Sequence, residues 1–181
     1  MYNNLKLTDK ELDSLLKNNL VILIDNREKK DKNTHITDWL DYKNRCQYMN
    51  MTLPTGDYSV MLRASPEVGI HQDLYFYNEI AIERKANLEE LSNNFTTKRS
   101  AFESEMLRAL STKLKLIVAI EDTRSRLYLG EYDTKYNRRS FIASIATFEN
   151  RYNVPFQFAI KEEMPVYIYT TLCYYVRERL K

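Results

Sequence analysis

Residues 80–85 read Ile-Ala-Ile-Glu-Arg-Lys, an apolar run that ends in three consecutive ionisable residues. In a β-strand, side chains alternate between two faces. The two isoleucines therefore share one face, while Glu83 and Lys85 share the other. A strand at this position can bury its isoleucines and present a carboxylate and an ammonium group side by side. The rest of the chain is arranged around this predicted strand.

A second carboxylate, Asp57, lies upstream in the sequence Pro-Thr-Gly-Asp-Tyr at residues 54–58. Two carboxylates on neighbouring strands can hold one Mg²⁺, which takes oxygen ligands and retains several waters. The metal lowers the pKa of a bound water and clamps a phosphate, and Lys85 can offset charge on the phosphorane or position the attacking water. The pattern Asp57, Glu83-x-Lys85 thus suits phosphodiester cleavage. A solvated strand end is the alternative interpretation of residues 83–85 alone.

Two further segments accompany this pattern. Residues 25–28, Asp-Asn-Arg-Glu, directly follow a predicted hydrophobic strand, and residues 56–58 read Gly-Asp-Tyr. Together with residues 83–89, Glu-Arg-Lys-Ala-Asn-Leu-Glu, they resemble in order the motifs of the XPF-type structure-specific nuclease domain, a branch of the restriction-endonuclease-like PD-(D/E)XK superfamily. Glu89 departs from the family pattern, which has Asp there. The resemblance covers residues 20–125 well, and the chain looks similar to small stand-alone members from bacteria and phages.

The resemblance implies a Mg²⁺-dependent endodeoxyribonuclease in which Mn²⁺ can substitute for Mg²⁺. The implied metal ligands are Asp57, Glu83 and the backbone carbonyl of Arg84, and Lys85 is the implied catalytic lysine. The implied reaction is hydrolysis near junctions, flaps or forks, which leaves a 5′-phosphate and a 3′-hydroxyl.

The remaining motif residues are expected to support this centre. Asp25 and Glu28 extend the catalytic acidic cluster, either as a further ligand or by fixing Arg27 and Arg84. These arginines either bind phosphates or brace the carboxylates, because a planar guanidinium serves both purposes. Glu89 lies in the first turn of a predicted helix, where the helix dipole favours a carboxylate; orienting a catalytic side chain is its alternative role.

Basic residues cluster in two segments, although the formal net charge of the chain is only +2. Residues 96–115 and 124–139 each carry five basic and two acidic residues. Basic patches beside a carboxylate site are what a protein that binds the phosphate backbone needs, whereas most charge clusters only solvate a face. The predicted DNA-binding residues are Arg27, Arg84, Lys98, Arg99, Arg124, Arg126, Arg138 and Arg139.

Hydrophobic periodicity predicts strands that alternate with helices. The predicted strands are residues 21–25, 46–52, 58–62, 74–85 (with a break near Asn78), 114–120 and 154–160. The predicted helices span residues 8–19, 35–44, 87–91, 96–111, 138–152 and 165–181, and residues 26–34 and 123–137 are predicted loops. Glu105, on the fourth of these helices, is near the place of a glutamine that family members often carry, and we assign it no catalytic role. The resulting fold is α/β, a restriction-endonuclease-like mixed sheet flanked by helices, in a single domain spanning residues 1–181.

Composition limits the possible functions further. The 181 residues are 44% hydrophobic and 29% charged, which is ordinary for a globular domain. No apolar run is long enough to span a membrane, and the N-terminus lacks a signal-peptide core, so we expect a cytoplasmic protein. Two Cys and two His without ligand spacing exclude a zinc site. With only three glycines there is no phosphate-binding glycine-rich loop, and we expect no nucleotide cofactor.

The expected partner is DNA, in branched form. Larger family members carry a tandem helix-hairpin-helix domain that binds DNA and dimerises, and the sequence shows none, so we also consider a homodimer or a targeting partner. Repair, recombination and phage DNA processing are all compatible with this prediction. The alternatives are a catalytically silent DNA-binding or scaffolding module of the same fold, and an unrelated α/β protein that matches by chance.

Overall fold

A computed structural model of the chain describes residues 7–27 and 30–181. Glu28, a member of the predicted acidic cluster, lies outside the described residues. The helices are α1 (Asp9–Asn19), α2 (Lys30–Asp41), α3 (Leu88–Phe95), α4 (Arg99–Thr112), α5 (Arg124–Leu129), α6 (Arg138–Tyr152) and α7 (Met164–Leu180), with short 3-10 turns at Tyr42–Asn44 and Pro66–Val68. The strands are β1 (Leu20–Asp25), β2 (Gln47–Met51), β3 (Tyr58–Leu62), β4 (Leu74–Tyr75), β5 (Ile80–Lys85), β6 (Lys115–Glu121) and β7 (Phe156–Ala159).

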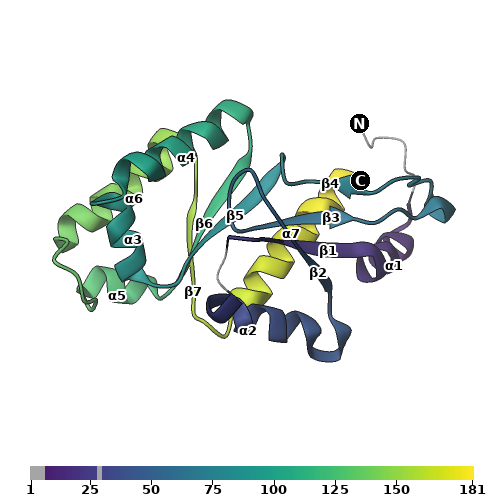
Figure 1. The fold of residues 1–181 in the computed structure, drawn as a ribbon, viewed down its shortest axis with the longest axis horizontal. Coiled ribbons are helices and arrows are strands. Elements are labelled where there is room, and N and C mark those ends of the chain that lie inside the picture. The colour runs from purple at the N-terminus through teal and green to yellow at the C-terminus, as the bar shows by residue number, and fades with distance from the viewer. Residues whose placement is uncertain (1–6, 28–29) are drawn as a thin grey trace.

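The strands form one mixed sheet in the order β2-β1-β3-β5-β6-β7, with β4 paired to β3 (Figure 1). Strand β1 is parallel to β2, and β5, β6 and β7 are parallel to one another. Strand β3 runs antiparallel to both β1 and β5. The carboxyl ends of β1, β2, β5, β6 and β7 therefore meet at one edge of the sheet, and β3 begins at that edge.

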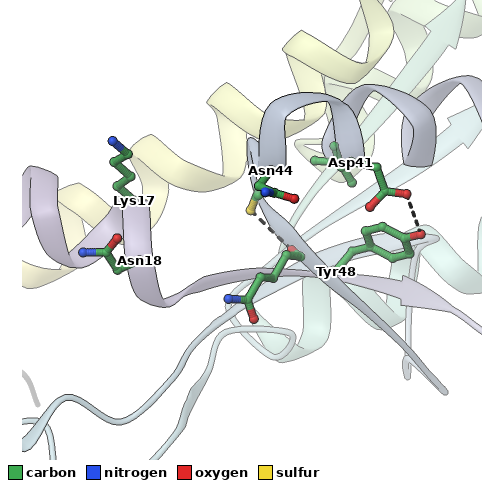
Figure 2. A pocket seen from close by; sticks show the side chains of 8 residues that line it. Lys17, Asn18, Asp41, Asn44 and Tyr48 are labelled. Carbon is green, nitrogen blue, oxygen red and sulfur yellow. Dashed lines mark hydrogen bonds between the residues drawn. The ribbon is translucent and has the colours of Figure 1, made fainter.

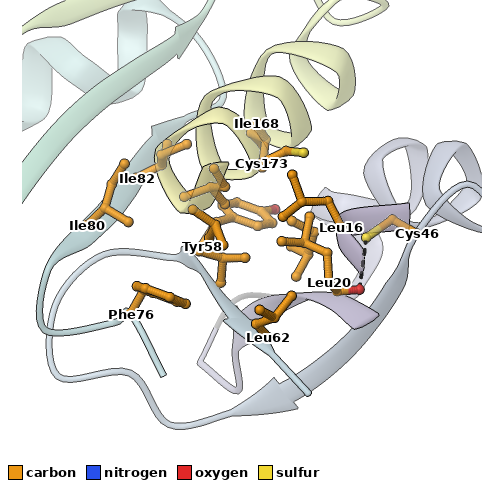
Figure 3. Packing of buried hydrophobic residues seen from close by; sticks show 14 of the residues in the cluster. Leu16, Leu20, Cys46, Tyr58, Leu62, Phe76, Ile80, Ile82, Ile168 and Cys173 are labelled. Carbon is orange, nitrogen blue, oxygen red and sulfur yellow. Dashed lines mark hydrogen bonds between the residues drawn. The ribbon is translucent and has the colours of Figure 1, made fainter. Parts of the chain in front are cut away.

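Two large hydrophobic cores cover the sheet, one on each face, and a smaller buried cluster is formed by Val21, Leu23, Leu53 and Met61. Helices α1, α2 and α7 bury side chains such as Leu16 and Ile168 against one face, where Tyr58 and the isoleucines of β5 lie (Figure 3). On the other face, α3, α4, α5 and α6 pack over β5, β6 and β7. Alternation along β5 produces this division, since Ala81 faces the second core and Ile80 and Ile82 face the first.

A cluster of phenylalanines holds the second core together. The ring of Phe95 lies 4.9 Å from that of Phe148 and 5.8 Å from that of Phe102, and the rings of Phe102 and Phe148 stack at 5.5 Å. All three are buried. Because Phe102 belongs to α4, this cluster fixes the helix that faces the charged end of β5.

The predicted fold class and single mixed sheet are confirmed, with local corrections. Helix α2 begins at Lys30, so the loop predicted to reach residue 34 is shorter than expected. The break expected near Asn78 is confirmed, since the predicted strand over residues 74–85 is divided into β4 and β5. Residues 123–137 are not entirely loop, because Thr123 caps a short helix, α5, that ends at Gly130. None of the described helices is long and apolar enough to cross a membrane.

Replacing Phe148 by Ala should destabilise the fold through the cavity it leaves. We expect the free energy of unfolding to fall by about 3–5 kcal/mol, measured by urea denaturation. Leu129→Ala is the control, because that side chain is 60% exposed and its loss should change stability by no more than about 0.5 kcal/mol. Equal effects of the two substitutions would contradict the packing described above.

Candidate functional site

Charged residues gather at the edge where the parallel strands end. Asp25 ends β1, residues 83–85 end β5 and Glu121 ends β6. Asp57 immediately precedes β3, which starts at the same edge because it is antiparallel to its neighbours. The topology therefore brings together four motifs that are far apart in the sequence, as expected for a site at the carboxyl ends of strands.

Backbone hydrogen bonds fix Asp57 beside β5. Its N–H donates to the carbonyl of Ile82 at 2.8 Å, and its Oδ2 accepts from the N–H of Arg84 at 2.7 Å. The preceding Gly56 has φ +78°, and an added Cβ would lie 2.9 Å from the Cβ of Ala81. Only glycine fits this close turn readily, so the Gly-Asp pair of the motif has a backbone reason.

Glu83 and Lys85 form a buried ion pair on the face of β5 that meets α4. The Lys85 ammonium donates to Glu83 Oε1 at 2.6 Å, and the side chains are only 8% and 12% exposed. The ammonium also lies 5.5 Å from the ring centre of Phe102. Burial alone would lower the pKa of Lys85, but the charge and hydrogen bond of Glu83, with the charges of Asp57 and Glu90, raise it above its usual value. Lys85 therefore stays positively charged.

A cavity of about 210 Å³ opens beside this pair, and both Asp57 and Glu83 line it. Glu105 and Arg108 of α4 and Arg27 also line it. Glu105 thus enters the cleft, where burial and the charge of Glu83 raise its pKa to about 7. Neither α4 residue was predicted to belong to the site. The available signal was helical spacing, because Glu105 follows the buried Phe102 by three residues.

Asp25 is engaged in bonds that anchor the neighbouring loop. Its Oδ1 accepts from the N–H and Nε of Arg27, and its Oδ2 accepts from Arg27 Nη2 and from the N–H of Leu53, all within 2.8 Å. Burial alone would raise the pKa of Asp25, but these bonds outweigh burial and hold the pKa below its usual value. The carboxylate thus fixes the loop that leads to Asp57, and its lone pairs are filled by donors.

Arg84 points to the opposite face of β5 from its two neighbours. Its Nε donates to Glu121 Oε2 at 2.7 Å, and the Nε2 of His35 from α2 lies 3.0 Å from the same oxygen. Arg84 braces Asp57 through its backbone and Glu121 through its guanidinium group. His35 was not predicted as a site residue.

Glu89 contacts neither Lys85 nor Arg84 through a hydrogen bond among the described residues. Its Oε1 instead accepts from the N–H of Asp133 at 2.9 Å and lies 3.9 Å from Arg126 Nη2. Glu89 therefore anchors the segment after α5. Its hydrogen bonds within the described part of the chain do not orient a catalytic side chain, which was the alternative role considered for it.

The predicted DNA-binding residues divide by location. Arg27 lines the acidic cavity, and Arg84 and Lys98 line a neighbouring one. Several of the others have protein partners: Arg99 pairs with Glu103, Arg126 pairs with Asp122, and Arg124 lies over the ring of Phe158. Arg138 and Arg139 are exposed at the start of α6.

The donor set suits a metal that keeps most of its water. Over residues 7–27 and 30–181, no group of three or more His, Cys, Asp and Glu side chains is placed to hold a metal. Asp57 and Glu83 are two carboxylates that line one cavity. Mg²⁺ fits such a set, because it is commonly held by one or two carboxylates together with waters and substrate phosphate oxygens.

A larger cavity of about 680 Å³ lies away from this edge, between the last turns of α1 and α2 and the start of β2 (Figure 2). Tyr48 donates there to Asp41 at 3.1 Å. The one thiol is that of Cys46, whose pKa burial raises to about 12, so it stays protonated. Cys46 and Cys173 are both free and buried.

Comparisons with known proteins agree with this architecture. A family model described as the ERCC4 domain matches residues 24–172. The structure of XPF from Aeropyrum pernix aligns with a TM-score of 0.61 and 17% identity over 89% of this chain, and the same protein in complex with DNA aligns with 0.58 and 16% over 88%. The chain spans 64% and 66% of those two chains. A search of curated proteins found no match.

Asp25→Asn should weaken the fold rather than only the chemistry. The substitution removes bonds to a buried carboxylate, and we expect the free energy of unfolding at pH 7 to fall by about 3 kcal/mol. Because the pKa of Asp25 is lowered on folding, its contribution is present above the unfolded pKa of about 3.9 and disappears as the pH falls through the folded value. Urea denaturation at several pH values should show the difference from wild type shrinking in acid. Asp38→Asn, on the exposed face of α2, is the control; an equal effect there would contradict the anchor role.

Glu105→Gln should stabilise the metal-free protein in a pH-dependent way. The pKa of Glu105 rises on folding from 4.5 to about 7, so the folded state loses stability as the pH rises between these values. Glutamine removes that loss, and we expect the urea midpoint in EDTA to exceed that of wild type at pH 8 and the gap to narrow at pH 5. The control is Glu178→Gln at an exposed position, which should show no such trend. If the difference in urea midpoint between Glu105→Gln and wild type were the same at both pH values, the raised pKa of Glu105 would be contradicted.

Proposed function

The chain belongs to the ERCC4 domain family, and on that premise we propose that it is a metal-dependent endonuclease that hydrolyses phosphodiester bonds in DNA. One observation carries the proposal: Asp57 and Glu83 line a single cavity, and the buried ammonium of Lys85 is bonded to Glu83 at its side. Two carboxylates and a lysine in this arrangement suit phosphoryl chemistry.

Mg²⁺ would be held by Asp57, Glu83 and the backbone carbonyl of Arg84, with Mn²⁺ as a substitute. When bound, the metal would activate a water and polarise the scissile phosphate. The backbone bonds from Asp57 to β5 keep the two carboxylates in fixed relative positions, so the ligand set is organised before metal binds. Asp25 takes no part as a ligand in this proposal, because its oxygens already accept four hydrogen bonds.

Lys85 is the residue that stabilises developing negative charge. Its pKa is raised, so it remains an ammonium, and a buried charge acts more strongly than one in water. Glu83 holds it in place. Arg27 and Arg108 line the same cavity and would bind the flanking phosphates as charged donors.

The proposed substrate is branched DNA, such as a flap, fork or junction, cleaved to a 5′-phosphate and a 3′-hydroxyl. Support comes from the family membership and from the structural similarity to XPF from Aeropyrum pernix, which has also been determined in complex with DNA. Because the chain spans under two thirds of that structure, recruitment through a homodimer or a targeting partner is part of the same proposal.

Cleavage of labelled flap, fork, four-way-junction and linear DNAs in Mg²⁺ tests this function. We expect cleavage by wild type that EDTA abolishes, and a rate reduced at least about 10²-fold by Asp57→Asn, Glu83→Gln and Lys85→Ala. Glu178→Gln, an acid-to-amide change at an exposed position of α7, should cleave as wild type does.

Folding of each variant is checked by its urea midpoint, so that lost activity is not lost structure. DNA binding without cleavage, equal in wild type and variants, would overturn the enzyme and leave a DNA-binding module of the same fold.

A further inference from the structure

A second cavity, of about 670 Å³, opens at the same edge of the sheet as the acidic one. It is bounded by α2, by the connection from β5 to α3, and by the end of β6. Arg84 lines it, whereas the adjacent Glu83 lines the acidic cavity. Because neighbouring residues of a strand point to opposite faces, the two cavities flank the end of β5.

The floor of this second cavity is electrically balanced. Arg84 and His35 both contact Glu121 Oε2, and the side chains of Arg84 and Glu121 are only 4% and 6% exposed. Burial lowers the pKa of His35, as do the charges of Arg84 and Lys161, and Glu121 only partly offsets this. His35 is therefore neutral at pH 7, and the positive charge of Arg84 is matched by Glu121.

The rim carries surplus positive charge. Lys32, Lys98 and Lys161 line the cavity, all three are exposed, and none forms an ion pair with another described residue. The acids on the rim are partly committed elsewhere: Glu90 Oε2 accepts from the N–H of Ala86 at 3.0 Å, and Glu89 faces Asp133 and Arg126. Three ammonium groups from separate segments thus converge on one hollow and are free to bind an external anion.

The chemistry of the lining favours a sugar-phosphate backbone over a base. No aromatic side chain is among the described residues that line the cavity, so it offers no stacking surface. Two backbone donors at the start of α3 are already used, since the N–H of Leu88 donates to Asp122 and that of Glu90 donates to Asn87. The exposed lysine side chains are the charged donors that would hold an anion here.

We propose that this second cavity binds the phosphate backbone of DNA that continues past the acidic cavity, with Lys32, Lys98 and Lys161 as its contacts and no reading of base sequence. The inference rests on the proposed nuclease function and adds to it where the DNA lies: over the end of β5, from the α4 side to the α2 side. Lys32 and Lys161 lie outside the two basic segments 96–115 and 124–139, and the proposal gives them a role that the sequence analysis did not assign.

The test measures DNA affinity without cleavage. A variant with Lys32→Gln, Lys98→Gln and Lys161→Gln is compared with a matched variant carrying Lys10→Gln, Lys17→Gln and Lys113→Gln. The matched changes remove the same charge from α1 and from the segment before β6, away from the carboxyl edge. Fluorescence anisotropy in EDTA, over a series of salt concentrations, is recorded with two labelled duplexes of different base composition.

We expect the cavity variant to bind at least about tenfold more weakly at low salt and the slope of log K against log salt to fall in magnitude by about 2–3, because each lost phosphate contact removes about 0.9. Both duplexes should lose affinity by the same factor, and the matched variant should retain the wild-type slope.

Three outcomes would overturn the proposal. In the first, the cavity variant binds DNA with wild-type affinity and salt slope, or both variants lose affinity equally. Either result would show that DNA does not contact the second cavity, and would leave the nuclease proposal intact. A loss confined to one duplex would show base reading instead of backbone binding. Absence of wild-type binding to any DNA, including the flap and junction substrates, would defeat the proposed function itself.

Discussion

The site depends on the pair of hydrogen bonds that fasten Asp57 to β5. The N–H of Asp57 reaches the carbonyl of Ile82, and its carboxylate receives the N–H of Arg84. Both partners are backbone groups of the strand that carries Glu83, so the position of Asp57 relative to this strand is fixed, and the Glu83 carboxylate is held in turn by Lys85. The left-handed turn at Gly56 allows this approach. A motif split by 25 residues in sequence thus becomes one rigid unit.

Concentrating charge at a sheet edge has an energetic cost that the fold offsets by pairing. Buried ions are tolerated when a partner and hydrogen bonds replace water. Lys85 forms an ion pair with Glu83, and Arg84 forms one with Glu121. Asp25 forms an ion pair with Arg27 and also accepts a hydrogen bond from a backbone N–H. Glu105 is partly buried and meets the like charge of Glu83, and these two effects raise its pKa to about 7. The least compensated group is therefore in the cleft, where a bound cation would relieve the repulsion.

How far the sequence could predict the site depends on whether a signal is local. The strand at 80–85 and the Gly-Asp turn were predictable, because both the alternation of apolar and polar residues and the preference of glycine for turns depend only on neighbouring residues in the sequence. The start of α2 and the existence of α5 were missed, because residues 30–34 and 124–126 are polar and lack the apolar periodicity that predicts a helix. The cap at Thr123 fixes the start of α5. The pairing of Arg84 with Glu121, and the entry of Glu105 into the cleft, arise from strand order and helix packing, which no single segment encodes.

Because side chains alternate along β5, the residues proposed for catalysis and the second cavity, proposed to bind the DNA backbone, lie on opposite faces of the strand. Glu83 lines the acidic cavity and Lys85 lies against Phe102 of α4, while Arg84 lines the second cavity beside α2. The acidic residues of one face can be replaced without removing the lysines of the other. These lysines, Lys32, Lys98 and Lys161, come from α2, the turn before α4 and the segment after β7. A chain of this fold that lost Glu83 would therefore keep the second cavity, which we propose as the site for the phosphate backbone. That independence gives a physical route by which catalytic and purely DNA-binding members of one fold can arise.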